Sequence, residues 1–337
     1  MDMTMIPISL KNFVIGISSK AEDCSQRLAF SCLHPQCSAK TVGCHSQQCN
    51  GALSAIAKNG KVIIPSKDSK GSIRRMLEGK SYNRRFYLEN INEATKFNGF
   101  CSKHDNLLFA PVEKRELVID DEDQIFAFQC RAIAVEVCRF RNLLVYFKLE
   151  KNLLKQCRKE SRRLDVEERL SLEQLRTIMY YEWNLLWRDN PKSQLYHAWR
   201  VLPKKLPISL ASCITPDIDN RFYEIYVRAL GEFGNNVLPR LGFTLTIVPQ
   251  EERTHIIMIW NRLFDPVIRT YRDRFMSSDI FIVETFLNEC VFCLSEDWCM
   301  NPDYWESLPQ STKDDLQYRV SKGMSEQAKS IPHIITL

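Results

Sequence analysis

Apolar residues recur at three- and four-residue steps in the middle of the chain. After the acidic run DEDQ, Ile125 and Phe128 begin a pattern of this kind that continues for more than thirty residues. Acidic residues stabilise the first turn of a helix because they face the positive end of its dipole. The pattern therefore predicts a long amphipathic helix over 121–158, and the same spacing predicts a second helix over 164–188.

The pattern changes between residues 199 and 262, where segments such as FTLTIVPQ and THIIMIW are separated by Pro, Asp and Asn. Segments rich in β-branched residues and bounded by turn residues are typical of strands, so we expect an antiparallel sheet there. Helical spacing returns over 266–292 and 310–322. We therefore expect a larger α+β domain over 119–337. Its predicted parts are helices over 121–190, a sheet-rich part over 199–262 and helices over 266–322.

The first third of the chain lacks these periods. Residues 31–52 are rich in Cys, Ser, Gln and Gly, which indicates a loop that apolar packing alone does not hold. The Asn59-Gly60 pair is a turn signal before the strand-like run KVII, and the run LLF at 107–109 indicates a helix. We expect a separate, small N-terminal domain over residues 1–118.

The composition excludes several classes of protein. Of 337 residues, 45% are hydrophobic and 26% are charged, so the chain can form a packed core and is neither disordered nor collagen-like. No run of 18 apolar residues predicts a transmembrane helix, and the first 20 residues do not resemble a secretion signal. Gly-rich phosphate loops and the GxSxG and HExxH motifs are absent. We expect a cytoplasmic protein without membrane contact.

Cysteine is abundant for a chain in a reducing compartment: there are 13, and five of them lie within residues 24–49. Two tight pairs stand out, Cys32 with Cys37 in CLHPQC and Cys101 with His104 in FCSKHDN. Two such pairs joined by a longer insert are typical of a structural, tetrahedral zinc site. The ligand set stays open, because the same stretch contains further candidates: His34, Cys44, His45 and Cys49. The alternative is that these cysteines are buried free thiols.

Positive charge is concentrated in the same part of the chain. Residues 1–115 hold 17 Lys or Arg against 9 Asp or Glu, and the segment from Lys58 to Arg85 alone holds nine against two. Guanidinium groups bind phosphates and aromatic rings stack on bases, so this segment favours contact with nucleic acid. The candidate residues are Arg74, Arg75, Tyr82, Arg84 and Arg85. The alternative is a solvated loop whose charge serves solubility.

The remaining cysteine and histidine motifs are interpreted as structural. Cys290, Cys293 and Cys299 lie in an apolar, aromatic pattern that favours core thiols over a redox or metal site. His197 in YHAWR and His255 in THIIMIW fall within strand-like runs, so we expect both to be structural histidines rather than catalysts.

A histidine follows the first cysteine pair in GCHSQQC, and the second pair lies in FCSKHDN. This order resembles the zinc-stabilised treble clef of HNH-type nucleases. The resemblance implies that His45 acts as general base and that Asp105 and Asn106 lie beside a catalytic Mg²⁺ or Mn²⁺. The chain departs from that pattern in its Cys-x-x-His second pair, in the 63 residues between Cys37 and Cys101, and in lacking a clear third histidine.

Five segments spread over residues 30–310 carry a wider resemblance: HSQQ, LSAIAKNGKV, FNGFCSKHDNLLFAPVE, FTLTIVP and NPDYWESL. They are similar to segments of a family of bacterial proteins of this length, encoded near mobile elements and phage-defence genes. That family has no established activity. The resemblance does imply a bacterial cytoplasmic setting, a two-part architecture and a protein partner from the same defence operon. Two hypotheses follow: an HNH-like endonuclease effector in anti-phage defence, or a non-catalytic zinc protein that binds nucleic acid or a partner as sensor or adaptor.

Overall fold

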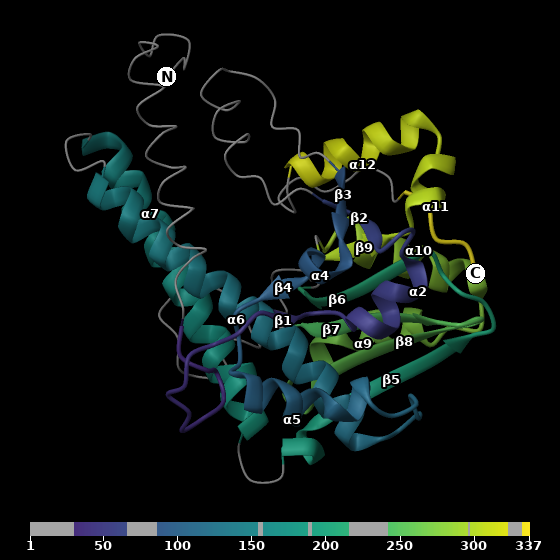
Figure 1. Ribbon diagram of the computed structural model, residues 1–337, viewed down its shortest axis with the longest axis horizontal. Coiled ribbons are helices and arrows are strands. Elements are labelled where there is room, and N and C mark those ends of the chain that lie inside the picture. The colour runs from purple at the N-terminus through teal and green to yellow at the C-terminus, as the bar shows by residue number, and fades with distance from the viewer. Residues whose placement is uncertain are drawn as a thin grey trace.

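The structure, a computed structural model, describes residues 30–65, 86–153, 158–187, 191–215, 242–295, 297–322 and 332–337. Figure 1 shows a central sheet surrounded by helices, with a long helical hairpin that projects to one side. The hairpin consists of α6, Glu122–Leu153, and α7, Arg158–Ile178. These confirm the two predicted long helices. The second one begins earlier than expected and ends at Ile178, where a π-helical turn and a 3₁₀ turn follow.

Seven strands form one antiparallel sheet in the order β3-β2-β9-β6-β7-β8-β5. The strands are β2 Lys61–Pro65, β3 Phe86–Asn90, β5 Leu195–Leu202, β6 Ile208–Ile214, β7 Phe243–Gln250, β8 Arg253–Asn261 and β9 Trp298–Met300. Every neighbouring pair is antiparallel. The mixed helix-and-sheet class with an antiparallel sheet is therefore confirmed, but β2, β3 and β9 of that sheet come from outside the predicted range 199–262.

The central strands β6, β7 and β8 are buried on both faces, which explains why their sequences are nearly continuous apolar runs, whereas the edge strands β3 and β5 are partly exposed. Successive side chains of a strand point to opposite faces. Along β8, Ile256 and Met258 belong to a core cluster shared with α9 and α10, whereas Ile257 and Ile259 belong to one shared with α6. The two helices of the first cluster are α9 Asp265–Phe275 and α10 Ile280–Phe292. The sheet is the middle of three layers.

The helical pattern predicted over 266–292 forms the two helices α9 and α10. Asp279 accepts a hydrogen bond from the backbone N–H of Phe281 at 2.9 Å and so caps α10, which separates it from α9. The helix predicted over 310–322 is α12, Gln310–Lys322. The shorter elements are η2 Cys49–Leu53, α2 Ser54–Ile56, α4 Ile91–Ala94, η3 Met179–Trp183, η4 Asn184–Trp187, η5 Pro191–Gln194, η6 Arg262–Phe264 and α11 Pro302–Ser307.

In the first third of the chain, a short antiparallel ladder joins β1 Cys44–His45 to β4 Lys96–Phe97, and α5 Ser102–Glu113 follows. The residues between β1 and β4 in the sequence include β2 and β3, which belong to the large sheet. Asn59 and Gly60 both have positive φ, 51° and 70°, as a tight turn before β2 requires. The division at residue 118 stays a prediction, although strands from before it complete a sheet with strands from after it.

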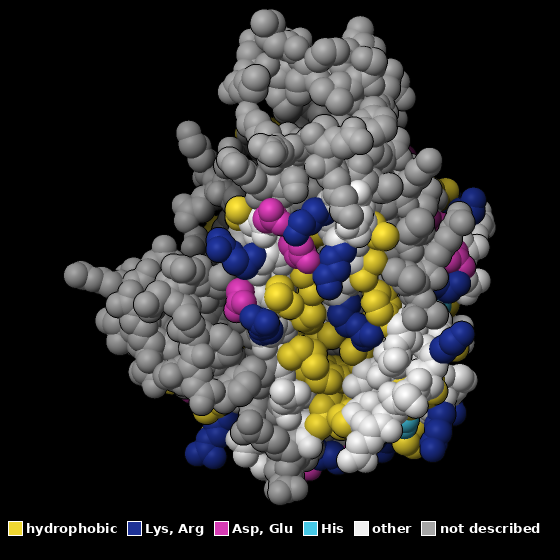
Figure 2. Space-filling model, turned by 90° about the vertical axis from the view of Figure 1, so that its left-hand side faces the viewer, with side chains coloured by type: hydrophobic (Ala, Val, Ile, Leu, Met, Phe, Trp, Pro, Cys, Tyr) yellow, Lys and Arg dark blue, Asp and Glu magenta, His cyan; other side chains and the backbone are white. Residues whose placement is uncertain are grey.

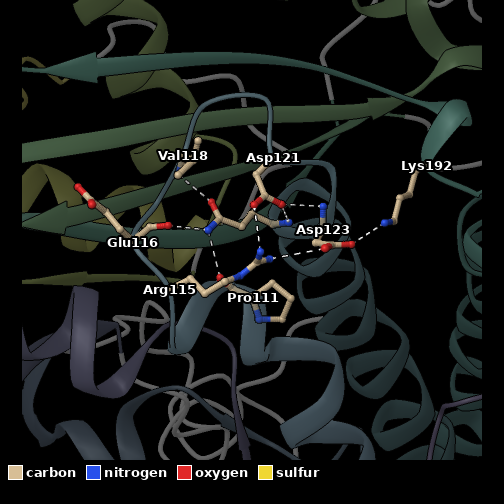
Figure 3. A network of polar contacts seen from close by, with 8 residues as sticks. Pro111, Arg115, Glu116, Val118, Asp121, Asp123 and Lys192 are labelled. Carbon is tan, nitrogen blue, oxygen red and sulfur yellow. Dashed lines mark hydrogen bonds and ion pairs between the residues drawn. The ribbon is translucent and has the colours of Figure 1, made fainter.

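A polar network connects α5 to α6 near that division (Figure 3). The buried side chain of Gln124 donates to the carbonyls of Pro111 and Glu116, at 3.1 and 2.7 Å, and accepts from the N–H of Val118 at 2.9 Å. Asp121 accepts from the N–H of Gln124 at 3.1 Å, which caps α6 with one of the acidic residues at its predicted start. Hydrogen bonds therefore hold the connection between α5 and α6 both at the end of α5 and at the start of α6.

The described cysteines form no disulfide. Cys290 and Cys299 are buried in the core, and Cys293 is partly buried. His197 Nε2 lies 2.7 Å from a carboxylate oxygen of Asp120, and His255 accepts a hydrogen bond from the indole of Trp199 at 3.1 Å. Across the described part of the chain, the helices are too short or too polar to cross a membrane.

Candidate metal centre

The four side chains named above as zinc ligands converge in the structure. They are Cys32, Cys37, Cys101 and His104, and their ligand atoms all lie within 4.8 Å of one another. His104 Nδ1 lies 3.4 Å from the Sγ atoms of both Cys32 and Cys101. The Sγ atoms of Cys37 and Cys101 are 4.0 Å apart. Bonds of about 2.0–2.3 Å to a tetrahedral Zn²⁺ give ligand separations of about 3.5–3.8 Å, so donors and spacing fit a Cys₃His site.

A tight turn brings the first two ligands together. The N–H of Cys37 donates to the carbonyl of His34 at 3.1 Å, and Gln36 has a positive φ of 62° just before it. The N–H of Cys32 donates to the carbonyl of Ala39 at 2.9 Å, which closes the loop from the other side. We call residues 32–37 the knuckle. Its two thiols face the same point because the backbone reverses between them.

Helix α5 supplies the other two ligands from its first turn. Cys101 is the N-cap residue, and His104 follows one turn into the helix. The backbone N–H of His104 lowers the pKa of the Cys101 thiol, as expected for a sulfur at a helix N-terminus. Burial, by contrast, raises the pKa of Cys32 to about 11. A bound divalent cation removes such a thiol proton, so metal binding at this site releases protons.

His34 lies beside this group rather than within it. Its ring stacks on the His104 ring with centroids 3.8 Å apart and planes 6° apart, and it meets Trp187 edge-on at 4.8 Å. The Nδ1–H of His34 donates to the carbonyl of Pro35 at 2.8 Å, which fixes the ring. These contacts hold the imidazole of His104 in one orientation.

Two other cysteines from the same stretch also lie outside the group. The Cys44 thiol is buried and donates to the carbonyls of Val42 and Phe100, at 3.5 and 3.6 Å. The Cys49 thiol donates to the side-chain oxygen of Asn92 at 3.4 Å. Among the described residues, the four-membered group is the only set of three or more His, Cys, Asp or Glu at metal-binding distance.

His45 lies at the end of β1, partly buried, with Nδ1 3.2 Å from the hydroxyl oxygen of Thr95. Burial lowers its pKa and nearby cations add to this effect, while the charge of Asp105 opposes them. The imidazole is therefore neutral at pH 7. Burial also raises the pKa of Asp105, and a hydrogen bond from the Cys44 thiol lowers it. His45 and Asp105 thus share one electrostatic environment between β1 and α5.

The third proposed catalytic residue, Asn106, does not face the environment that His45 and Asp105 share. Asn106 is exposed, and its side-chain amide donates back to the carbonyl of Ser102 on its own helix at 2.8 Å. The five candidate nucleic-acid-binding residues lie outside the described residues: Arg74, Arg75, Tyr82, Arg84 and Arg85. What the structure describes is how their segment is attached, because Pro65 of β2 pairs with Phe86 of β3.

Two polar residues that contact the last turn of α5, Arg131 and Gln48, were not predicted from the sequence. Arg131 of α6 is buried, pairs with Glu113 at 2.5 Å and lies over the ring of Phe109 at 4.2 Å. The side-chain amide of Gln48 donates to the carbonyl of Val112. Both contacts fix the last turn of α5. The signals were present in the sequence: an arginine interrupts the apolar pattern QCRAIAVEV, and the HSQQ segment places two amides after His45.

Comparison of the chain with protein-family models, with curated proteins and with solved structures gave no significant match.

Proposed function

We propose that this chain is a zinc-stabilised nucleic-acid-binding protein in which one Zn²⁺ fastens the knuckle to the start of α5. The observation that carries the proposal is the convergence of three thiols and one imidazole at separations suited to a tetrahedral ion. With all four positions filled by the protein, such a site is structural and contributes folding free energy. The expected ligands are Cys32, Cys37, Cys101 and His104.

The nucleic-acid part of the proposal is supported by charge and placement. The basic segment from Lys58 to Arg85 contains β2 and ends directly before β3, which pairs with β2, and it lies on the part of the chain that separates β1 from β4. A second surface with cationic groups lies on the side from which α7 projects, where Lys and Arg side chains, with Asp and Glu side chains among them, flank a strip of hydrophobic ones (Figure 2). Cationic groups of this kind bind phosphates without regard to sequence.

The first test is the metal content of the purified protein, measured by elemental analysis on the wild type and His45→Ala together. We expect one zinc per chain in both, because His45 contacts Thr95 and stands outside the ligand group. Loss of zinc from His45→Ala alone would make His45 a ligand, and no zinc in either protein would return these cysteines to ordinary core thiols.

The second test is binding of fluorescent single- and double-stranded DNA and RNA, followed by anisotropy over a range of salt concentrations. We expect Arg84→Ala combined with Arg85→Ala to weaken binding and to reduce the slope of log affinity against log salt by about 1–2. Arg262→Ala with Arg269→Ala is the control, since both arginines are exposed on the far part of the chain. Equal effects of the two double variants would refute a specific role for the basic segment.

A second candidate is HNH-like hydrolysis, favoured by the common environment of His45 and Asp105. The neutral imidazole of His45 can accept a proton from water, and Asp105 can act as an anionic neighbour. A Mg²⁺ or Mn²⁺ ion would supply charge stabilisation at the scissile phosphate. A role for Asn106 has no support here, because its amide is engaged with Ser102.

Nicking of supercoiled plasmid in the presence of Mn²⁺ tests this candidate. If the chain is a nuclease, His45→Ala abolishes nicking while zinc content and fold remain, and His197→Ala leaves nicking unchanged. Activity that survives His45→Ala at full rate would exclude His45 as the base.

We place this function in the bacterial cytoplasm, within anti-phage defence and together with a partner from the same operon. The resemblance described above is the basis for the defence setting and the partner. The lack of disulfides among the described cysteines agrees with a reducing compartment.

A further inference from the structure

A small cavity lies between the HSQQ segment, helix α6 and strands β6 and β7. Polar residues from three of these elements are part of its lining: Ser46, Gln47, Gln48, Arg131 and Thr246. Each of them is at most 6% exposed. The cavity has room for about one water molecule. Its walls are therefore deep inside the protein and much more polar than the core around them.

Polar atoms on four of these residues have no hydrogen-bond partner among the residues that the structure describes. They are Oε1 of Gln47, Oε1 of Gln48, Nε and Nη1 of Arg131, and Oγ1 of Thr246. A buried polar group without a partner destabilises the folded state, and such groups are rare in native proteins. Their concentration around one cavity indicates a bound molecule that pairs with them.

The two glutamine amides are fixed with their oxygens as the unpaired atoms. Nε2 of Gln47 donates to the carbonyl of Asp297 at 2.7 Å, and Nε2 of Gln48 donates to the carbonyl of Val112. Turning either amide over would place its oxygen against a carbonyl oxygen, so both oxygens remain acceptors. A molecule in the cavity must therefore donate two hydrogen bonds.

Arg131 supplies the opposite chemistry. Its Nη2 pairs with Glu113 at 2.5 Å, and its Nε–H and Nη1–H remain as donors. The hydroxyl of Thr246 can donate or accept. A bound anion such as chloride would meet the two amide oxygens, and a bound cation would meet the guanidinium. Water donates two hydrogen bonds and accepts two, and it is the one common molecule of this size that satisfies both sets.

We propose that this cavity is the binding site of one internal water molecule. The water donates to Oε1 of Gln47 and of Gln48, and it accepts from the Arg131 guanidinium and the Thr246 hydroxyl. It joins the residues directly after His45 to α6 and β7. This inference gives the two amides of the HSQQ segment a role, and it is independent of the zinc site and of nucleic-acid binding.

The first test is the sign of a stability change. Thr246→Val replaces the hydroxyl with a methyl group of nearly the same size. If the hydroxyl pairs with a bound water, its loss lowers the midpoint of denaturant unfolding, whereas replacement of an unpaired buried hydroxyl raises it. Thr244→Val is the matched control on β7, because its hydroxyl donates directly to Gln129 and its loss lowers the midpoint in either case. An unchanged or raised midpoint in Thr246→Val overturns the proposal.

The second test counts the water itself. Magnetic relaxation dispersion of water nuclei counts the molecules that stay in a protein for longer than the protein takes to tumble. We expect Gln47→Met combined with Thr246→Val to hold about one long-lived water fewer than the wild type. Thr244→Val should hold the same number as the wild type, since Thr244 is outside the cavity lining. Equal numbers in the wild type and the double variant refute the site.

A change of salt separates water from a bound anion. The difference in unfolding midpoint between the wild type and Thr246→Val is measured in chloride and then in gluconate, which is too large for the cavity, at the same ionic strength. We expect the same difference in both salts. A difference that disappears without chloride would identify an anion site and overturn the assignment of water.

Discussion

The two ends of α5 are held by different chemistry. At its start, Cys101 and His104 belong to a Cys₃His group whose ligand atoms lie at metal-binding distance from one another. At its last turn, the carbonyl of Val112 accepts from Gln48 and the carboxylate of Glu113 pairs with buried Arg131. With the proposed zinc bound, the first end would depend on metal supply and pH, whereas the second depends on the chain alone. Loss of the proposed metal should therefore release one end of the helix and leave the other in place.

The largest effect is expected from Cys101→Ser. Loss of one thiolate should abolish tight zinc binding and lower the free energy of unfolding by about 3 kcal/mol or more. Elemental analysis checks the metal, and hydrogen exchange checks the helix: amides near residue 105 should exchange faster, while those near 112 stay protected. The control is Cys299→Ser, a buried cysteine outside the group, which should keep its zinc. Uniform loss of protection along α5 would contradict independent ends.

The converse experiment is Arg131→Met, which removes the ion pair with Glu113 at the last turn of α5. This change removes a buried guanidinium and leaves Glu113 able to reach water, so we expect a loss of about 2–3 kcal/mol in a denaturant titration. Zinc content should stay at the wild-type value. Arg115→Met is the matched control, because Arg115 makes exposed pairs with Asp121 and Asp123 that contribute less than about 1 kcal/mol. Zinc loss from Arg131→Met would show that the two ends are coupled.

The pH dependence should separate the ends further. In the metal-free chain the Cys32 thiol, with a pKa of about 11, is protonated at neutral pH, so metal binding displaces this proton. Zinc affinity should therefore rise with pH, by about tenfold or 1.4 kcal/mol per unit for each proton released. Burial lowers the pKa of His104 below its usual 6.5, so proton competition at the imidazole adds to this only in more acidic solution.

A chelator competition at pH 6, 7 and 8 measures this slope. Hydrogen exchange at the last turn of α5, corrected for the intrinsic pH dependence of exchange, should show the same protection at all three values. A zinc affinity that does not change with pH would mean that Cys32 is already a thiolate without metal.

The smallest effect is expected from His34→Ala. The stacked ring only orients His104, so its loss should reduce stability by about 0.5–1 kcal/mol and weaken zinc binding a few-fold. His34→Phe should restore most of the loss by replacing one flat ring with another. A complete loss of zinc from His34→Ala would instead place His34 among the ligands.

The sequence was informative where the signal is local. Each ligand pair spans one turn of the knuckle or of α5, so its spacing reports geometry directly. The Asn59-Gly60 turn and the acidic cap of α6 are local for the same reason. The break between α9 and α10 also had a local signal, since Ser277, Ser278 and Asp279 precede the second helix.

Long-range pairing could not be predicted in this way. Ile63 pairs with Met300 across most of the chain, and β9 has only three residues, too few to show a period. The partners of Arg131 and of Asn288, 18 and 47 residues away, could not be predicted either: a buried charge or amide shows in the sequence, but the group that it contacts does not. The pairing of the two ends of the basic segment was likewise visible only in the structure.

The position of β2 between β3 and β9 has a consequence for synthesis of the chain on the ribosome. All four ligands have been translated by residue 104, whereas β9 follows at residues 298–300. At about 5–20 residues per second, the interval is on the order of tens of seconds. During that time the nascent hairpin of β2 and β3 has an open edge that can pair with other chains. Early capture of a metal ion would fold the front of the chain before the sheet closes, and cells starved of zinc should therefore accumulate this protein as aggregates formed during translation.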